Sequence, residues 1–208
     1  MSPRFIVLDG VEGCGKSTQA RKLAAHLRAE GHEVVLTHEP GGTPVGEAIR
    51  ELILDPAYPE MDPLAELMLF CASRAQHCRQ VIAPALQRGA WVVCDRFSSA
   101  TLAYQGHAGG LGVAAVQQVN RVATAGLEPD LLIVLDADPR VGWARKFSGK
   151  QSDPADRIEQ KSLQFHEAVR EGFRQVARCA KAAVVIDADR SPEEVFSSVI
   201  AAILEGAC

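Results

Sequence analysis

The segment from Gly10 to Ser17, which reads GVEGCGKS, constrains the fold of this chain more than any other feature of its sequence. It fits the Walker A pattern of a phosphate-binding loop, in which a glycine-rich loop joins a strand to a helix. The apolar run Phe5 to Leu8 supplies the strand, and apolar residues at helical spacing through Leu23 and Leu27 supply the helix. All fixed positions and both flanking elements agree, which disfavours a chance glycine-rich turn.

The chemistry of this loop predicts a nucleoside triphosphate site. Glycines let backbone N–H groups converge on phosphate oxygens, and the helix N-terminus adds partial positive charge. Lys16 is expected to bridge the β- and γ-phosphates, and the Ser17 hydroxyl to ligate Mg²⁺. The same loop serves switches, motors and small-molecule kinases, so it does not name the reaction. The residues predicted to bind ATP are Gly10, Val11, Glu12, Gly13, Cys14, Gly15, Lys16, Ser17 and Thr18.

Four further apolar runs alternate with helical patterns along the rest of the chain. The predicted strands cover residues 33–38, 91–94, 131–135 and 184–186, in addition to the first strand. This alternation predicts an α/β fold of the P-loop NTPase type, with three layers, a five-stranded parallel sheet and helices on both faces. Ligands are expected at the carboxyl ends of the strands.

Several helix boundaries can be assigned from cap and breaker residues. A helix is predicted over roughly residues 45–54, and Asp62-Pro63 opens a long helix with a kink at Pro84 and a stop at Gly89. The sequence Ser191-Pro192-Glu193-Glu194 is a capping box for the last helix. Tyr104 and Gln105 are expected in a glycine-rich, mobile loop, and a polar stretch at about 146–156 is expected to be a mobile flap.

Length and composition indicate one domain, 1–208, and limit its partners. At 208 residues and 47% hydrophobic content the chain can bury one substantial core, and its net charge of −4 argues against nucleic-acid binding. No apolar run approaches the ~20 residues needed to span a bilayer, and the first residues do not resemble a signal peptide. We therefore expect no membrane partner and a cytoplasmic location. The six cysteines lack paired short spacing and are interpreted as reduced thiols.

Polar residues at two places suggest where the chemistry lies. Asp95 ends a buried strand, where a carboxylate can hold a Mg²⁺-bound water, and Arg96 can reach a phosphate as a bidentate donor. Phe70 and Arg74 are four residues apart on one helix, so their side chains are neighbours. The alternative interpretations are a strand-end ion pair for Asp95, and a core phenylalanine beside a solvated arginine for the helical pair.

At this point the chain resembles the thymidylate kinases, from the glycine-rich loop nearly to the C-terminus. The resemblance rests on 39–43 (EPGGT), Phe70 with Arg74, 95–97 (DRF), 103–106 (AYQG) and 156–159 (DRIE), in this order. It implies transfer of the γ-phosphate of ATP to dTMP, giving dTDP and ADP, with Mg²⁺ as cofactor. It also implies a homodimer that forms through the long helix after Asp62 and its neighbours.

The resemblance implies a role for each residue of the dTMP site. Phe70 would stack on thymine, Arg74 would donate to a pyrimidine carbonyl and Arg96 would contact the dTMP phosphate. Tyr104 would lie against the sugar, where a 2′-hydroxyl would collide, and Thr101 would bond the base edge. Asp9 and Glu12 would lie near sugar and metal, and Asp95 would hold Mg²⁺ through water. Glu39 would position Mg²⁺ or the acceptor phosphate, and Arg50 would contact that phosphate. The complete set implied for dTMP is Asp9, Glu39, Arg50, Phe70, Arg74, Arg96, Thr101, Tyr104 and Gln105.

The catalytic cation is expected to come from the flap. No arginine lies between Gly10 and Ser17, which resembles the bacterial arrangement in which flap arginines offset the charge of the transferring phosphoryl group. Arg145 and Arg157 match that pattern, whereas Phe147 and Gly149 stand where arginine is often found; Lys146 and Lys150 are the alternative cations. The catalytic residues predicted here are Lys16, Arg96, Arg145 and Glu12.

Three alternative functions stay open from the sequence. One is another nucleoside monophosphate or deoxynucleoside kinase, because a single methyl group separates dTMP from dUMP. The second is a P-loop regulatory NTPase, which would need a guanine-reading Asn-Lys-x-Asp element that residues 131–140 do not contain. The third is a nucleotide-dependent interaction module, in which Phe70 with Arg74 and the Asp95-Arg96 pair would have no evident task.

Overall fold

A parallel sheet of five strands forms the centre of the computed structural model, which describes residues 5–147 and 155–205. The strands lie in the order β2-β3-β1-β4-β5, and all four neighbouring pairs are parallel. The predicted five-stranded parallel sheet is therefore confirmed. The strands are β1 (Phe5–Gly10), β2 (Val34–His38), β3 (Trp91–Asp95), β4 (Leu131–Asp136) and β5 (Ala183–Asp187).

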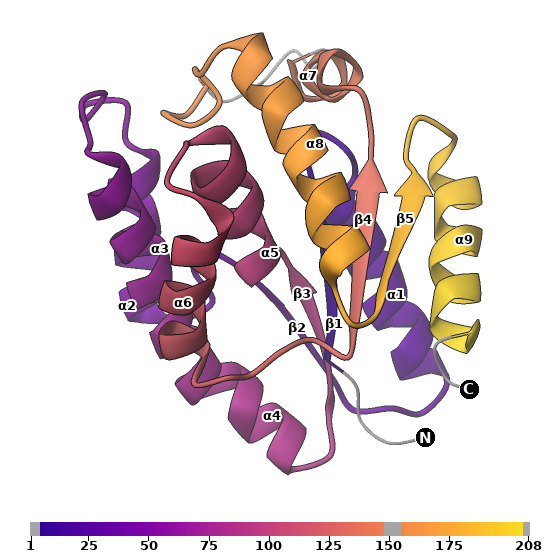
Figure 1. Cartoon of the computed structure of the whole chain (residues 1–208). Helices are drawn as coiled ribbons and strands as arrows, with labels where there is room; N and C mark the ends of the chain where they lie inside the picture. The colour runs from indigo at the N-terminus through magenta and orange to yellow at the C-terminus, as the bar shows by residue number, and fades with distance from the viewer. Residues whose placement is uncertain (1–4, 148–154, 206–208) are drawn as a thin grey trace.

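Helices cover both faces of this sheet. In Figure 1, α8 crosses in front of β4 and β1, while α1 lies behind the sheet and packs against α9. Helices α2, α3 and α6 form a further group, in which α3 packs against both α2 and α6; the group lies to the left of β3 in Figure 1. The helical segments are α1 (Lys16–Ala29), α2 (Pro44–Leu54), α3 (Pro63–His77), η1 (Cys78–Ile82), α4 (Ala83–Gln87), α5 (Ser98–Thr101), η2 (Leu102–Ala108), α6 (Val113–Thr124), α7 (Pro139–Phe147), α8 (Leu163–Cys179) and α9 (Pro192–Glu205).

The strand order places a crevice at the carboxyl end of β1. The chain leaves β1 toward β2 on one side and reaches β4 on the other, so the topology reverses at β1, where ligands bind in open α/β sheets. The carboxyl ends of β1 and β3 each carry an acidic residue, Asp9 and Asp95. The two lie at the same edge of the sheet, because Leu8 pairs with Asp95 in the register of the two strands. The glycine-rich loop follows β1 directly and so lies at this switch point.

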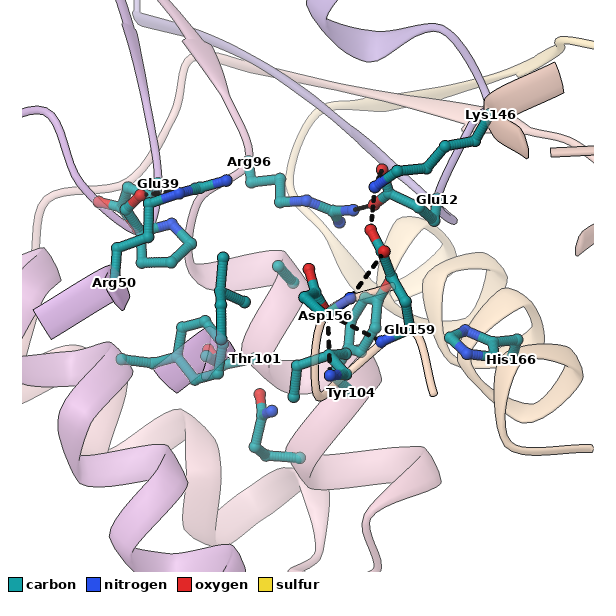
Figure 2. A pocket seen from close by; sticks show the side chains of 16 residues that line it. Glu12, Glu39, Arg50, Arg96, Thr101, Tyr104, Lys146, Asp156, Glu159 and His166 are labelled. Carbon is teal, nitrogen blue, oxygen red and sulfur yellow. Dashed lines mark hydrogen bonds and ion pairs between the residues drawn. The ribbon is translucent and has the colours of Figure 1, made fainter. Parts of the chain in front are cut away.

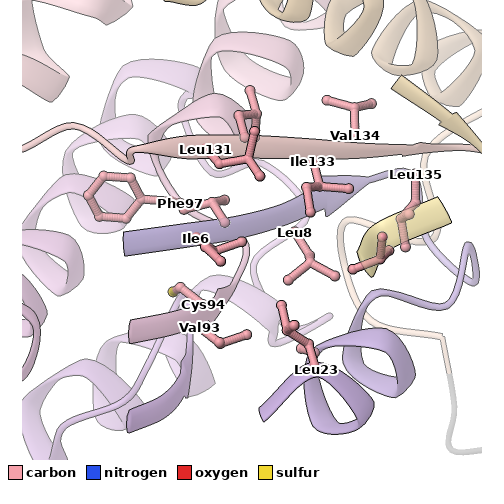
Figure 3. Close-up of a cluster of buried hydrophobic side chains, with 14 of the residues drawn as sticks. Ile6, Leu8, Leu23, Val93, Cys94, Phe97, Leu131, Ile133, Val134 and Leu135 are labelled. Atoms are coloured by element: carbon pink, nitrogen blue, oxygen red, sulfur yellow. The ribbon is translucent and has the colours of Figure 1, made fainter. Parts of the chain in front are cut away.

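The core lies between the sheet and its flanking helices. Figure 3 shows Ile6 and Leu8 of β1 among residues of β3, β4 and α1, and these two side chains have no exposed surface. The Phe97 ring, also fully buried, packs edge-on against Phe5 with 4.9 Å between ring centroids. Burial on both faces explains the continuous apolar runs that predicted the central strands. No helix in the described residues is long and apolar enough to cross a membrane.

The predicted caps are present, and the long helix is broken differently from the prediction. Asp62 accepts from the N–H of Leu64 at 2.9 Å, and Ser191 and Glu194 cap each other reciprocally. The helix from Pro63 passes through the π-helical turn η1 before Pro84, where the N–H of Ala83 bonds five residues back to the Cys78 carbonyl. A wider turn at this point accommodates a proline that has no N–H to donate.

The expected loop around Tyr104 and Gln105 is wrong, because both residues lie in the helical segment η2. Small residues let η2 pack closely against α8: a Cβ added at Gly172 would lie 3.1 Å from the Ala103 Cα. Tertiary packing therefore keeps the chain helical through Ala108, and the turn begins at Gly109. Most of the predicted flap, residues 148–154, lies outside the described residues.

Candidate active site

The glycine-rich loop has the backbone that a phosphate cradle needs. Gly13 and Gly15 have φ of 70° and 96°, in the left-handed region that glycine tolerates, and α1 begins immediately afterwards at Lys16. A Cβ at Gly13 would lie 2.0 Å from the Gly142 carbonyl oxygen, so α7 also requires glycine there. The Lys16 ammonium folds back over the loop and donates to the Val11 carbonyl at 2.7 Å.

A cavity opens in front of this loop, and apart from two glycines the residues that line it are polar or charged. Its cations come from different elements: Lys16 from α1, Arg50 from α2, Arg96 from the end of β3, and Arg145 with Lys146 from α7. We call it the phosphate cavity. Its lining consists of Glu12, Gly13, Gly15, Lys16, Ser17, Thr18, His38, Glu39, Arg50, Asp95, Arg96, Arg145 and Lys146. Converging cations and a helix N-terminus suit a polyanion.

The remaining loop residues hold the cradle together from behind. Val11 accepts from Lys16, and the Gly10 carbonyl accepts from Arg96 at 3.0 Å. The Cys14 sulfur is buried beneath the loop, 3.7 Å from the Lys16 nitrogen. Burial, opposed by Lys16 and Arg96, raises the pKa of the Cys14 thiol above its ordinary value, which keeps it neutral.

Ser17 and Asp95 meet at the floor of the phosphate cavity. The Ser17 hydroxyl donates to Oδ2 of Asp95, and Oδ1 of the same carboxylate is buried without a hydrogen-bond partner among the described residues. A hydroxyl beside an unpaired carboxylate oxygen fits a hard divalent cation, which prefers oxygen ligands. Among the residues described, no group of three or more His, Cys, Asp or Glu side chains could hold a metal alone. The remaining ligands would have to be water or substrate.

Arg96 is held in one conformation by its backbone and by four partners. Its φ of 71° lies in the left-handed region, which is unfavourable for a residue with a Cβ. The guanidinium donates to the Gly10 carbonyl and to Glu12 at 2.9 Å, and it lies 3.5 Å from Asp9 and over the Tyr104 ring. This backbone strain is tolerated because these contacts fix the side chain. Arg96 lines the phosphate cavity and also a second cavity, which is described below.

The two carboxylates that face Arg96 have opposite pKa shifts. Burial raises the pKa of Asp9 above its ordinary value, partly offset by Arg96 and by the Ser99 hydroxyl. Burial acts in the same direction on Glu12, but the charges of Lys16, Arg96 and Lys146 outweigh it and hold the pKa of Glu12 well below its ordinary value. Glu12 is therefore a fixed negative charge that orients two cations.

A second cavity begins on the other side of Arg96, and Figure 2 shows its lining. Phe70, Ala100 and Ile158 supply apolar surface, and Thr101, Tyr104 and Gln105 supply polar groups. We call it the base cavity. Its complete lining is Glu12, Glu39, Pro40, Arg50, Leu54, Phe70, Arg96, Ala100, Thr101, Tyr104, Gln105, Lys146, Asp156, Ile158, Glu159 and His166. An aromatic and aliphatic wall beside polar groups that can bond the edge of a ring is typical of a site for a flat organic ring.

The two cavities meet at five charged residues. Glu12, Glu39, Arg50, Arg96 and Lys146 line both the phosphate cavity and the base cavity. Figure 2 shows the Arg50 side chain reaching toward Arg96, whose guanidinium points away from Arg50 to Glu12, with Lys146 on the far side of Glu12. Two ligands bound in the two cavities would therefore place their charged ends against the same cations.

Arg74 lies behind the base cavity rather than in its lining. Its side chain is 1% exposed and donates to Glu39 at 2.8 Å, to Thr101 at 3.1 Å and to Asn120 at 2.7 Å. The remaining Nη donates to the Phe97 carbonyl at 3.0 Å. Arg74 thus orients Glu39 and Thr101, which do line the cavity. The four-residue spacing from Phe70 indicated that the two side chains share a helix face. It could not show which of them lines the cavity and which supports the lining residues.

The region of the predicted flap contributes Arg145 and Lys146 to the described structure. Arg145 donates to the Ala188 carbonyl at 2.8 Å and lines the phosphate cavity. Lys146 forms ion pairs with Glu12 and Glu159. Arg157 is buried and bonds the Ile53 carbonyl and Glu66, so it supports the wall of the base cavity. Lys150 lies outside the described residues.

Sequence reasoning missed several residues that build this site. Glu66 and Asn120 hold Gln105, Thr101 and Arg74 from beneath, and His77 lies 3.0 Å from Glu39. His166 and Glu159 line the base cavity. Burial lowers the pKa of His166, which favours a neutral ring. Buried polar residues on apolar helix faces were the available signal for Glu66 and His77, but their partners lie about 40 positions away in sequence.

Comparisons with known proteins agree with this geometry. The family model described as thymidylate kinase matches residues 8–199. The thymidylate kinase of Deinococcus radiodurans is 46% identical over 202 residues, which cover 97% of this chain and 96% of that protein. The Pelotomaculum thermopropionicum enzyme is also 46% identical, over 99% of this chain and 94% of its own. The crystal structure of thymidylate kinase from Ehrlichia chaffeensis superposes with a TM-score of 0.80 at 30% identity, covering 98% of this chain and all of that one.

Proposed function

The chain belongs to the thymidylate kinase family, and we propose that its two joined cavities are the subsites for the two substrates. The reaction is the ATP-dependent phosphorylation of dTMP to dTDP, which makes this chain a nucleoside monophosphate kinase. The observation that carries the proposal is the set of five charged residues common to both cavities. A phosphate from each side would meet there, as a direct transfer requires.

In this proposal the phosphate cavity holds ATP and catalysis comes from position and charge. The loop N–H groups and Lys16 bind the β- and γ-phosphates, and Arg96 and Arg50 hold the acceptor phosphate in line. Asp9 and Glu12 fix Arg96 from behind at 3.5 and 2.9 Å. No covalent enzyme intermediate is needed, because a dTMP phosphate oxygen is already a nucleophile once it is oriented.

The base cavity would hold the thymidine half of dTMP. Phe70 supplies a face for the thymine ring, and Thr101 and Gln105 supply polar groups at its edge. Tyr104 and Glu39 line the path toward the shared cations, next to the sugar and acceptor phosphate. Arg74 would act by positioning Thr101 and Glu39, to which it donates at 3.1 and 2.8 Å.

The test of this function is ADP release in the presence of ATP and Mg²⁺ with a panel of nucleoside monophosphates. Turnover with dTMP, weaker turnover with dUMP and very little with purine nucleotides is the expected result. One methyl group in a hydrophobic pocket changes the binding free energy by only about 1–3 kcal/mol, so dUMP should retain some activity. ADP release that does not depend on the acceptor would instead favour a regulatory NTPase.

We propose Mg²⁺ as the divalent cation, held by the Ser17 hydroxyl and, through water, by Asp95. The unpaired buried oxygen of Asp95 supports this assignment. When bound there, the ion would offset negative charge on the phosphate oxygens. We predict that Asp95→Asn raises the Mg²⁺ concentration for half-maximal rate roughly 10- to 100-fold, as loss of such a contact usually does.

This metal prediction is checked by initial rates over a range of Mg²⁺ concentrations. Asp187→Asn is the matched control, because Asp187 also ends a strand but lies at β5, with a side chain that is 62% exposed. The control should leave the Mg²⁺ requirement unchanged. An Asp95→Asn variant with the wild-type requirement would remove Asp95 from the metal site.

We propose that Arg145 supplies the flap cation. It lines the phosphate cavity on α7, directly before the segment that lies outside the described residues. Arg145→Ala is expected to lower the single-turnover rate at least about tenfold more than Lys150→Ala, because a planar guanidinium can bond two phosphate oxygens together. Equal losses in the two variants would show that the assignment is wrong.

We further propose that the chain folds as one kinase domain and works as a cytoplasmic homodimer. Leu64 and Met68 of α3 are 50% and 48% exposed, and Val45 and Leu52 of α2, which packs against α3, are 52% and 39% exposed. A second copy would cover these apolar side chains. Light scattering that gives a monomeric mass at micromolar concentration would contradict the dimer.

The proposed cytoplasmic location agrees with the free cysteines, because thiols stay reduced in that compartment. Four of them, Cys14, Cys71, Cys78 and Cys94, are buried. Cell fractionation tests the location.

A further inference from the structure

Glu66 is a buried carboxylate beneath the base cavity, fixed from two sides. It lies on α3 and is 3% exposed. One oxygen accepts from the Gln105 side-chain nitrogen at 2.6 Å, and the other accepts from the Arg157 guanidinium at 2.5 Å, with the Lys161 nitrogen 3.6 Å away. Arg157 is itself held by the Ile53 carbonyl at 2.8 Å. Glu66 is therefore an acceptor locked in place by cations.

This contact determines which end of the Gln105 amide faces the cavity. A carboxylate only accepts hydrogen bonds, so the amide must turn its nitrogen toward Glu66 and its oxygen away. Gln105 is 3% exposed and lines the base cavity, and its oxygen Oε1 is buried without a hydrogen-bond partner in the described part of the chain. A buried acceptor of this kind is unfavourable until a ligand donates to it.

The polar atoms of pyrimidine bases show what that donor can be. Thymine and uracil carry one ring donor, the N–H at N3, between two carbonyl acceptors. Cytosine has a lone pair at N3, and its donor is displaced to the exocyclic amine at C4. An acceptor fixed opposite N3 therefore pairs with thymine and repels cytosine. For Gln105 to present its nitrogen to cytosine, its oxygen would have to face the Glu66 carboxylate.

We propose that Glu66 is a specificity-determining positioning residue, which holds Gln105 with its oxygen toward the base and so selects pyrimidines with a donor at N3. The proposal rests on the proposed function, which places the base in this cavity. Glu66 itself touches no substrate; it acts through the orientation of one amide. Arg157, which directly follows the predicted flap, donates to Glu66 and so helps to hold this orientation.

The test compares acceptor selectivity in Glu66→Gln and in wild type. A glutamine at 66 can donate to the Gln105 oxygen, so the amide can turn and present its nitrogen to cytosine. We expect the ratio of kcat/KM for dTMP to kcat/KM for dCMP to fall at least about tenfold in this variant. Lys161→Gln is the matched control, because it removes a partly exposed partner of Glu66 without touching the amide contact, and its ratio should stay within about twofold of wild type.

Two outcomes would overturn the proposal. If Glu66→Gln lowers turnover of dTMP and dCMP equally and leaves their ratio unchanged, Glu66 is only a structural residue. If wild type binds dTMP methylated at N3 as tightly as dTMP, Gln105 does not read N3; this measurement needs no folded variant. Failure of the proposed function is distinguishable, since wild type would then not phosphorylate dTMP at all.

Discussion

Replacing Lys16 with methionine is expected to lower kcat for dTMP phosphorylation by about 10³-fold while dTMP still binds. The Lys16 ammonium is 6% exposed and sits over the loop that would carry the β- and γ-phosphates. Burial acts to lower the pKa of Lys16, but Glu12 and Asp95 nearby raise it above its ordinary value, so the group is charged at neutral pH. Methionine keeps the apolar stem and removes only this charge.

The measurement is kcat with saturating ATP, together with dTMP binding by calorimetry. Lys22→Met is the matched control on the same helix, because Lys22 is a surface residue paired with Glu193, and its kcat should match wild type. A Lys16→Met variant that loses less than about tenfold in kcat would mean that the loop does not stabilise the transferring phosphoryl group.

Replacing Arg96 with methionine should damage both activity and stability. Arg96 is the cation between the two cavities, so we expect kcat/KM for dTMP to fall about 10²- to 10³-fold, with an increase in KM. It is also the partner of Asp9, which has no exposed surface. Breaking a buried ion pair of this kind costs about 3 kcal/mol of unfolding free energy.

The stability loss in Arg96→Met should depend on pH in a definite direction. Burial already raises the pKa of Asp9, and removal of Arg96 raises it further. A carboxyl whose pKa is higher in the folded state favours folding when protonated, so the deficit should be smaller at about pH 5 than at about pH 7.5. Chemical unfolding at both pH values measures it, with the exposed Arg88→Met as control. A pH-independent deficit would contradict the role given to Asp9.

Much of the fold follows from local sequence. The five strands were predicted from their apolar runs, which are nearly continuous in β1, β3 and β4 because these central strands are buried on both faces. The caps at Asp62 and Ser191 act within four residues. The strand order β2-β3-β1-β4-β5 and the helical state of residues 102–108 were not predicted. Both depend on packing between distant segments, which periodicity does not report.

The site was predicted unevenly, for the same reason. The resemblance to thymidylate kinases is confirmed at the family level, by the matching family model and by the identity to known members. Phe70 lines the base cavity, whereas Arg74 lies behind it, because Glu39 and Asn120 approach that helix from other elements. Supporting residues such as Glu66 carry no motif and are identified only by their contacts.

The most direct test of the joined cavities is calorimetry with one molecule that fills both. Adenosine and thymidine joined through their 5′ positions by a chain of phosphates should bind once per protein chain, more tightly than ATP or dTMP alone, and should be displaced by either nucleotide. The linked molecule would lose this advantage if the cavities do not communicate. Binding that only one of the two nucleotides displaces, or that is no tighter than its halves, would contradict the account.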